Sequence, residues 1–252
     1  MIILWKFIFI FIMINNSLNQ EENKKIKAAI FDLDGTLLDT QRLYDEANQS
    51  VISKYGNGRP YDIELQAKIH GSSPMFGNKY MMEYFEIKLS LQEFMDKKKE
   101  YLKDKIINCK PIEGVKELTH ILKHKYGLKT AIATSSLKVS VDMKLTNHQE
   151  WIKSADFDII ITGDDKRIIK AKPSPDIFLI SAKELGVRPE ECIIFEDAIN
   201  GVQAGLNTGA AIVVGLPNSY AKNTMENLPY DKCKTKLCVL DSFKDFDYSL
   251  IK

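Results

Sequence analysis

The stretch Ala29–Thr40, AIFDLDGTLLDT, ends an apolar run with two aspartates one residue apart, followed by a glycine. Asp32 and Asp34 are two positions apart, so on an extended backbone their side chains point to the same side. Two carboxylates held this close repel each other unless a cation or a proton lies between them. The stretch therefore predicts a strand that ends either at a functional site or at an ordinary polar turn.

Other short apolar runs rich in Ile, Val and Phe show little alternation between apolar and polar positions. This pattern is typical of strands buried on both faces, as in a parallel sheet. Helical patterns lie between the later runs: Val115–Tyr126 is followed by Gly127 as a C-cap, and Ser174 is an N-cap with Pro175 at the first helical position. The alternation predicts an α/β fold with a doubly wound parallel sheet. The predicted strands are Ile26–Phe31, Lys129–Ala133, Asp158–Ile161, Cys192–Phe195, Ala211–Val214 and Leu237–Leu240.

Residues 41–108 interrupt this alternation, because they contain amphipathic helical stretches and no convincing strand. The stretches are Leu43–Tyr55, Gly77–Phe85 and Leu91–Ile107. We therefore expect a helical cap domain over residues 41–108, inserted into an α/β catalytic core made of residues 21–40 and 109–252.

The N-terminal run MIILWKFIFIFIMI is apolar through Ile14 apart from Lys6, and it is too short for a comfortable membrane span. It contains the apolar region of a signal peptide, but the following NNSLNQ lacks the small residues of a cleavage site. Residues 1–20 are thus either a signal or anchor, or the product of a start assigned upstream of Met13. We expect a cytoplasmic protein that meets a membrane only if this run belongs to the mature chain.

The composition limits the kinds of partner that we expect the chain to bind. The chain of 252 residues has 35 Lys and Arg against 34 Asp and Glu, so no overall basic bias points to nucleic acid. Its 4 cysteines show neither a CxxC motif nor zinc-like spacing with histidines, which favours reduced thiols. We expect a monomer whose partner is a small molecule.

Polar residues follow the predicted strands, where an open parallel sheet binds its ligands. They are Asp32 and Asp34, then Thr134, Ser135 and Ser136, then Lys172, and last Glu196 and Asp197. Carboxylates such as Asp32, Asp197 and Glu196 suit Mg²⁺, which would let an anionic nucleophile meet a phosphate. One aspartate could attack phosphorus, and Asp34 could act as acid and base. Thr134, Lys172 and the backbone N–H groups near Ser135 would hold the phosphoryl oxygens.

This ordered set resembles the motifs of the haloacid dehalogenase superfamily of phosphatases from about residue 27 to the C-terminus. The motifs are DLDGT at Asp32–Thr36, a strand ending in Thr134, Lys172, and Glu196-Asp197. The resemblance implies that Asp32 is the nucleophile and Asp34 the acid/base. It also implies that Mg²⁺ is held by Asp32, the Asp34 carbonyl and Asp197, with Glu196 beside it, and that the helical insert is a cap over a small soluble substrate.

Several segments look more closely like the pseudouridine-5′-phosphatase branch of this family: LLDTQRLYDEA, ATSSLKVSVDMKLTNHQEW, GDDKRIIKAKPSPDIFL and FEDAINGVQAG. The substrate implied is pseudouridine 5′-phosphate or a similar small nucleotide or sugar phosphate. The alternatives are glycerol 3-phosphate and 2-deoxyglucose 6-phosphate, because phosphatases of those esters resemble the chain almost as well. Ala171 stands where glycine is usual before the lysine, a mild departure.

Two other classes stay open. A β-phosphoglucomutase-like enzyme would carry a histidine where this chain has Tyr44, which weighs against isomerisation. A binding protein with the same fold would lack part of the catalytic set, and no member is missing. In the insert, Tyr44 and the loop residues Gly71, Ser72 and Ser73 are the candidate substrate contacts.

Overall fold

The computed structural model describes residues 25–69, 74–152, 157–218 and 221–251. Six parallel strands form one sheet in the order β3-β2-β1-β4-β5-β6. The strands are β1 (Ala28–Phe31), β2 (Lys129–Ala133), β3 (Ile159–Ile161), β4 (Cys192–Glu196), β5 (Ile212–Gly215) and β6 (Lys236–Val239). This confirms the predicted doubly wound α/β fold, and each predicted strand is found within two residues of its bounds.

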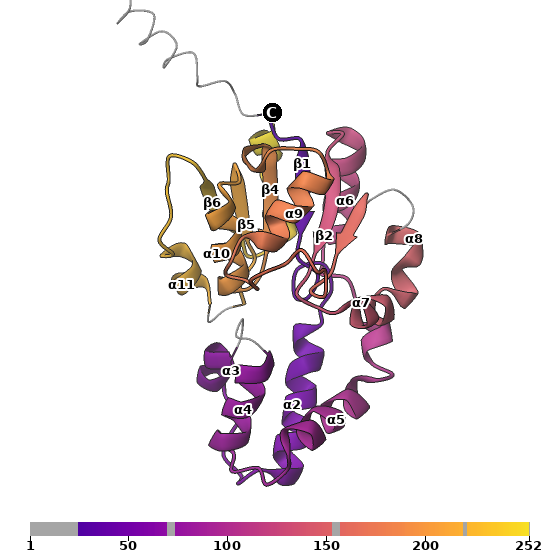
Figure 1. Ribbon diagram of the computed structural model, residues 1–252, viewed down its shortest axis with the longest axis vertical. Coiled ribbons are helices and arrows are strands. Elements are labelled where there is room, and N and C mark those ends of the chain that lie inside the picture. Colours follow the sequence, from indigo (N-terminus) through magenta and orange to yellow (C-terminus); the bar gives the residue numbers. More distant parts are fainter. Residues whose placement is uncertain (1–24, 70–73, 153–156, 219–220, 252) are drawn as a thin grey trace, which may run out of the picture.

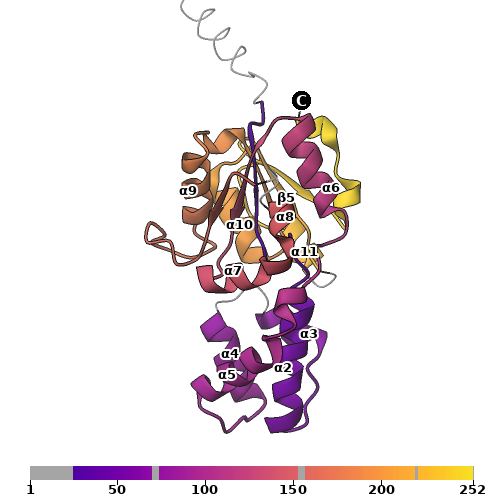
Figure 2. The same ribbon diagram turned by 90° about the vertical axis from the view of Figure 1, so that its right-hand side faces the viewer.

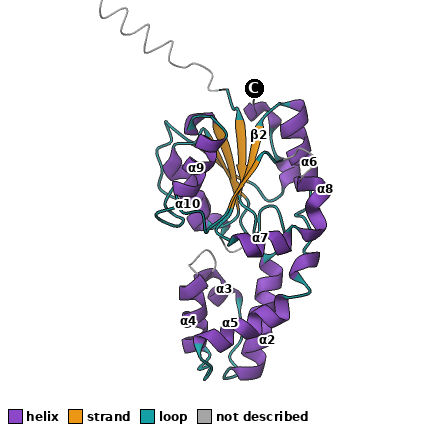
Figure 3. Cartoon of the chain, turned by 45° about the vertical axis from the view of Figure 1, so that its right-hand side comes forward, coloured by secondary structure: helices purple, strands orange, loops and turns teal. Residues whose placement is uncertain are grey.

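Helices cover both faces of the sheet (Figure 3). Alternate residues of every strand except the edge strand β3 enter separate apolar clusters. Phe31 of β1 packs with Val115 and Leu118 on one face, and Ile30 packs with Phe178 on the other. The helices of this part are α6 (Val115–His120), α7 (Lys138–Lys144), α8 (Gln149–Trp151), α9 (Asp176–Glu184), α10 (Ile199–Thr208) and α11 (Lys222–Glu226). Burial on both faces explains why the strands lack alternation.

A second group of helices lies beyond the carboxyl ends of the strands (Figures 1 and 2). It comprises α2 (Gln41–Tyr55), α3 (Ile63–Ile69), α4 (Pro74–Tyr84) and α5 (Leu91–Leu102), which we call the helical unit. The helical unit has its own apolar cluster, with Phe85 and Phe94 fully buried. No described residue of this stretch lies in a strand.

Short turns complete the chain, and one helix end differs from expectation. The 3₁₀ turns are Ile106–Asn108, Thr146–His148, Pro189–Glu191, Phe243–Asp245 and Tyr248–Ile251. The helix after His120 continues as a π-helical turn over Ile121–Lys125 before Gly127, whose φ of 68° suits a glycine. The predicted N-cap at Ser174 is wrong: Pro175 occupies the cap position, and the Ser174 hydroxyl donates to Asp176 instead.

No helix among the described residues is long and apolar enough to cross a membrane. The predicted leader, residues 1–20, lies outside those residues, as do Gly71, Ser72 and Ser73.

Candidate active site

The site lies where the strand order reverses direction, between β1 and β4, which is where doubly wound sheets bind ligands. Phe31 pairs with Phe195, and the N–H of Asp32 donates to the carbonyl of Phe195 at 3.0 Å. This register sets Asp32 beside Glu196 and Asp197 at the ends of neighbouring strands. All three are buried, so the carboxylates meet in a region of low water content.

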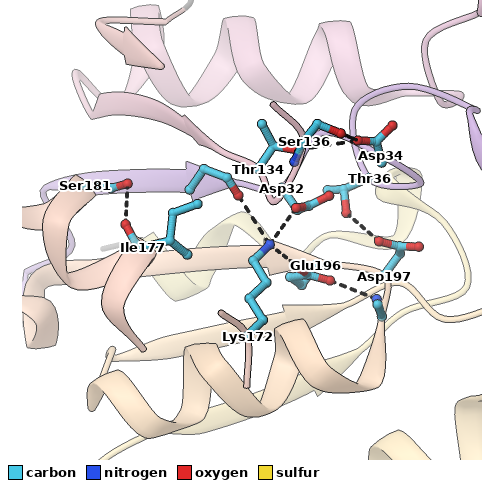
Figure 4. Close-up of polar contacts among 12 residues, drawn as sticks. Asp32, Asp34, Thr36, Thr134, Ser136, Lys172, Ile177, Ser181, Glu196 and Asp197 are labelled. Atoms are coloured by element: carbon cyan, nitrogen blue, oxygen red, sulfur yellow. Dashed lines mark hydrogen bonds and ion pairs between the residues drawn. The ribbon is translucent and has the colours of Figure 1, made fainter. Parts of the chain in front are cut away.

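Lys172 joins two of these carboxylates (Figure 4). Its Nζ lies 2.5 Å from Oδ1 of Asp32 and 2.7 Å from Oε1 of Glu196, and it also donates to the carbonyl of Ala133 at 3.3 Å. The ammonium therefore contacts the ends of β1, β2 and β4 at once. Oε2 of Glu196 accepts the N–H of Ala198 at 2.8 Å, so protein groups engage both oxygens of Glu196.

Asp34 is held apart from that cluster by a different set of donors. Lys144 Nζ lies 2.5 Å from Oδ1 and 2.7 Å from Oδ2, and the Ser136 hydroxyl donates to Oδ2 at 2.7 Å. Thr40 donates to Oδ1 at 2.7 Å, and the Thr134 hydroxyl lies 3.5 Å from Oδ2. Figure 4 shows the Asp34 carboxylate turned toward Ser136 and away from Lys172.

The turn after β1 brings this loop against Asp197. Gly35 has a φ of 87°, which glycine adopts without strain, and its N–H donates to the Leu38 carbonyl at 2.8 Å. A Cβ on Gly35 would lie 2.1 Å from Oδ2 of Asp197, so no larger residue fits without moving that carboxylate. Thr36 donates its hydroxyl to Oδ1 of Asp197 at 3.2 Å.

The pKa values of the two aspartates of the opening motif shift in opposite directions. Burial raises the pKa of Asp32 to about 7, with Glu196 and Asp34 adding to the rise and Lys172 opposing it. Burial and the charges of Glu196 and Asp32 also raise the pKa of Asp197. Burial acts in the same direction on Asp34, but Lys144, Ser136 and Thr40 outweigh it and hold its pKa below the ordinary value. The cluster around Asp32 thus carries more negative charge than Lys172 balances, which is an environment suited to a cation.

Six candidate residues named from the sequence lie together at the carboxyl ends of the strands: Asp32, Asp34, Thr134, Lys172, Glu196 and Asp197. Their roles in catalysis and binding stay predictions. Ser135 is exposed, and it is its neighbour Ser136 that reaches Asp34. Tyr44 of α2 lies close to this part of the site, because its ring centroid is 5.5 Å from Lys144 Nζ.

Three residues that contact the site carboxylates were not predicted as site residues from the sequence: Lys144, Thr36 and Thr40. Thr36 and Thr40 lie inside the opening stretch, where their spacing from Asp34 gave no separate signal. Lys144 follows Val141 by three positions and precedes Leu145, both buried, so a lysine on the apolar face of a helix was the available clue.

Residues 29–214, well over half of the chain, match the family described as haloacid dehalogenase-like hydrolase. A probable pseudouridine-5′-phosphatase of Drosophila melanogaster is 32% identical, over 76% of this chain and 82% of that protein. A probable pseudouridine-5′-phosphatase of Saccharomyces cerevisiae is also 32% identical, over 78% and 85%. The crystal structure of a putative beta-phosphoglucomutase from Thermotoga maritima superposes with a TM-score of 0.63 at 31% identity, covering 85% of this chain and 94% of that one.

Proposed function

Because this chain belongs to the haloacid dehalogenase-like hydrolases and is a phosphatase of that family, we propose that it hydrolyses a small phosphomonoester through an aspartyl-phosphate on Asp32. The observation that supports this mechanism is the contact of Lys172 with Asp32 and Glu196 across two strand ends. Lys172 holds Oδ1 of Asp32, which leaves Oδ2 as the attacking oxygen in our proposal.

In the first step, Oδ2 of Asp32 forms a bond to phosphorus as the bond to the ester oxygen breaks. Asp34 gives a proton to the leaving alkoxide, for which it must first be protonated against the effect of Lys144, Ser136 and Thr40, which hold its pKa below the ordinary value. In the second step, water attacks the phosphorus of the aspartyl-phosphate and Asp34 takes a proton from it, which releases inorganic phosphate and restores Asp32. The contacts with Lys144 and Ser136 favour the carboxylate form of Asp34, the form that the second step needs.

Lys172 and Thr134 are proposed to hold the phosphoryl oxygens, together with the N–H groups near Ser135. Lys172 suits this role because its side chain is 9% exposed and fixed between two carboxylates. Charge-assisted hydrogen bonds from a fixed ammonium stabilise charge that develops in the transition state.

Mg²⁺ is the proposed cofactor. Among the described residues, no group of three or more His, Cys, Asp or Glu side chains is arranged to hold a metal ion. Mg²⁺ does not need such a group, because it commonly binds one or two carboxylates and keeps several waters. The buried Asp32 and Asp197 fit that pattern, with the Asp34 carbonyl as a third oxygen and Glu196 as the partner of Lys172. The ion would supply positive charge that offsets repulsion between nucleophile and phosphate.

The proposed substrate is pseudouridine 5′-phosphate or a similar small nucleotide or sugar phosphate, with glycerol 3-phosphate and 2-deoxyglucose 6-phosphate as alternatives. The helical unit is the proposed cap domain, because it lies beyond the carboxyl ends of the strands and contributes Tyr44 near the site. A helical group in this position can exclude water and contact the leaving group.

The test is phosphate release from a panel of phosphomonoesters by purified protein, with and without Mg²⁺ and EDTA. We expect hydrolysis that requires Mg²⁺, and a transient phosphoryl adduct on Asp32 detected by rapid quenching and peptide mass spectrometry. Isomerisation of a sugar 1-phosphate without phosphate release would indicate a mutase, and full activity in excess EDTA would contradict the metal assignment.

A further inference from the structure

Basic side chains gather at the end of the sheet opposite the candidate active site. The candidate active site lies at the carboxyl ends of the strands, and the helical unit lies beyond it (Figure 1). The described chain enters at the other end, where Lys25 precedes β1. Strands of 4 or 5 residues, such as β1 and β2, separate the two ends by about 13–17 Å. A partner bound at the amino ends would therefore leave the candidate active site open.

Three segments at the amino ends, residues 25–27, 125–129 and 183–191, hold six Lys and Arg against three Glu. We call the six basic side chains, all of them exposed, the basic face: Lys25, Lys27, Lys125, Lys129, Lys183 and Arg188. The other residues of the chain hold 29 Lys and Arg against 31 Asp and Glu, so the positive charge is local. A local positive field attracts and orients anionic partners.

Hydrogen bonds join these segments into one surface. The N–H of Lys27 donates to the Glu191 carbonyl at 2.8 Å, and the N–H of Lys129 donates to the Lys27 carbonyl at 2.9 Å. Lys129 also donates its Nζ to the Leu185 carbonyl at 2.5 Å. Lys27 and Lys183 line the same cleft. The basic face is therefore continuous across segments that are far apart in the sequence.

The glutamates of these segments offset little of this charge at the surface. Glu191 is buried, with 7% exposure, and Glu184 pairs with Arg167, which lies outside the basic face. Glu190 lies 3.4 Å from Arg188. Within the described ranges, no ion pair with a carboxylate is found for four lysines of the basic face: Lys25, Lys125, Lys129 and Lys183.

The apolar run MIILWKFIFIFIMI precedes this surface in the sequence. Residues 15–24 connect Ile14 to Lys25, and ten residues span at most about 33–36 Å. The run is therefore tethered close to the basic face. An apolar run of this length suits the interface of a membrane better than a full span. One apolar anchor alone gives marginal membrane binding, and stable attachment takes a second signal such as a polybasic patch.

We propose that the basic face docks on an anionic lipid surface, with the apolar run inserted beside it and the candidate active site turned toward water. Each lysine close to such a surface strengthens binding about fivefold. This attraction falls off within a Debye length of about 8–10 Å, so lysines gathered on one face act together. Nucleic acid is another polyanion that a basic surface can bind, but it offers no apolar phase for the run.

The test is sedimentation of the full-length protein with phosphatidylcholine vesicles, with and without phosphatidylserine. We expect binding at least about tenfold tighter with phosphatidylserine, and weaker as salt rises. The triple variant Lys25→Glu/Lys125→Glu/Lys183→Glu should weaken this binding at least about fiftyfold. Its thermal midpoint should match the wild type, because these three exposed ammonium groups make no ion pair in the described structure. Unchanged vesicle binding by this variant would overturn the proposal.

A matched control makes the same change of charge at the opposite end of the molecule. Lys79, Lys88 and Lys103 are exposed lysines in or beside the helical unit. Lys79→Glu/Lys88→Glu/Lys103→Glu should bind vesicles with phosphatidylserine as the wild type does. An equal loss in both triple variants would show that binding follows the overall charge, which would contradict docking through the basic face.

Trp5 allows insertion of the run to be measured directly. The chain has 2 tryptophans, and the other, Trp151, is buried with 8% exposure. Brominated lipids should therefore quench Trp5, and Ile8→Asp/Ile10→Asp should remove the quenching and weaken vesicle binding. Unquenched emission, or tighter binding to duplex DNA than to vesicles, would overturn the proposal. These readouts do not depend on phosphate release, so their failure would leave the proposed phosphatase mechanism standing.

Discussion

The ammonium of Lys144 and the carboxylate of Asp34 form an ion pair at 2.5 Å, in which the Lys144 side chain is fully buried and that of Asp34 is 24% exposed. The Ser136 hydroxyl joins them, since it donates to Asp34 and accepts from Lys144 at 2.8 Å. The end of α7 is thereby fastened to the loop that follows β1. Lys144 also lies near the ring of Tyr44, so the same ammonium connects the loop to the helical unit.

Lys144→Met should destabilise the protein by about 2–3 kcal/mol, because it leaves a partly buried carboxylate without its cation. Asp34→Asn should also destabilise, since it leaves Lys144 buried without a negative partner. The free energy of unfolding of the double variant should fall by clearly less than the sum of the two single losses, which urea unfolding can measure. Simple additivity would show that the pair contributes no coupling, and it would contradict the structural role given to Lys144.

Asp32→Asn should lower turnover at least about a thousandfold, because an amide is not a nucleophile toward phosphorus. The fold should persist, since the amide oxygen can still accept from Lys172 and one charge is removed from a crowded cluster. We expect a thermal midpoint equal to or above that of the wild type. Asp39→Asn, in the same loop, is the control and should retain activity. A low midpoint for Asp32→Asn would mean that its inactivity reflects unfolding rather than chemistry.

Gly201→Ala should lower kcat while the protein stays folded. A Cβ on Gly201 would lie 1.8 Å from Oε1 of Glu196, the oxygen that Lys172 contacts, so Glu196 and then Lys172 must move. Gly205→Ala is the matched control on α10, because its Cβ would lie 3.2 Å from a methyl of Val213 and far from any catalytic carboxylate. Steady-state kinetics should show a loss of about tenfold or more for the first variant and near wild-type activity for the second.

The sheet and the strand-end residues could be predicted from sequence because both depend on local patterns. Continuous apolar runs identify buried parallel strands, and the rule that ligands bind at the carboxyl ends then groups Asp32, Lys172 and Asp197 without any coordinates. The contacts of Lys144 with Asp34 could not be predicted in this way, because they join residues 110 positions apart through the orientation of one helix.

The cavity of about 350 Å³ between α2, α4 and α5 of the helical unit could not be predicted for a related reason. Asn48, Asn78 and Lys98 lie on three different helices, and each reads as an ordinary polar residue in its own segment. Their convergence depends on helix packing, which sequence periodicity does not specify. The prediction that Ser174 is the N-cap of α9 was wrong for a more local reason. Asp176 accepts the N–H groups of Ile169 and Lys170, and this loop contact shifts the helix start past Ser174.

The free energy of unfolding should depend on pH through Glu191. Lys27, at 2.5 Å, and the N–H of Arg188 lower the pKa of Glu191 from its ordinary value of 4.5 to about 2. A depressed pKa in the folded state contributes stability above about pH 4.5, and that contribution is lost as the pH falls toward 2. Urea unfolding of wild type and Glu191→Gln should therefore differ most near pH 6 and converge near pH 2. A constant difference across this range would contradict the assignment.

Mg²⁺ should raise the thermal midpoint of the wild type, because an ion that binds only the folded state stabilises it by mass action. At a free concentration of 100 times Kd the gain is about 2.7 kcal/mol. Asp197→Asn removes one proposed ligand and should abolish most of the shift, while the exposed Asp241→Asn should leave it intact. Asp32→Asn should reduce the shift as well, although its own midpoint is unchanged or higher. Equal Mg²⁺ shifts in all of these variants would show that the ion acts elsewhere on the protein, and the carboxylates between β1 and β4 would then need another cation.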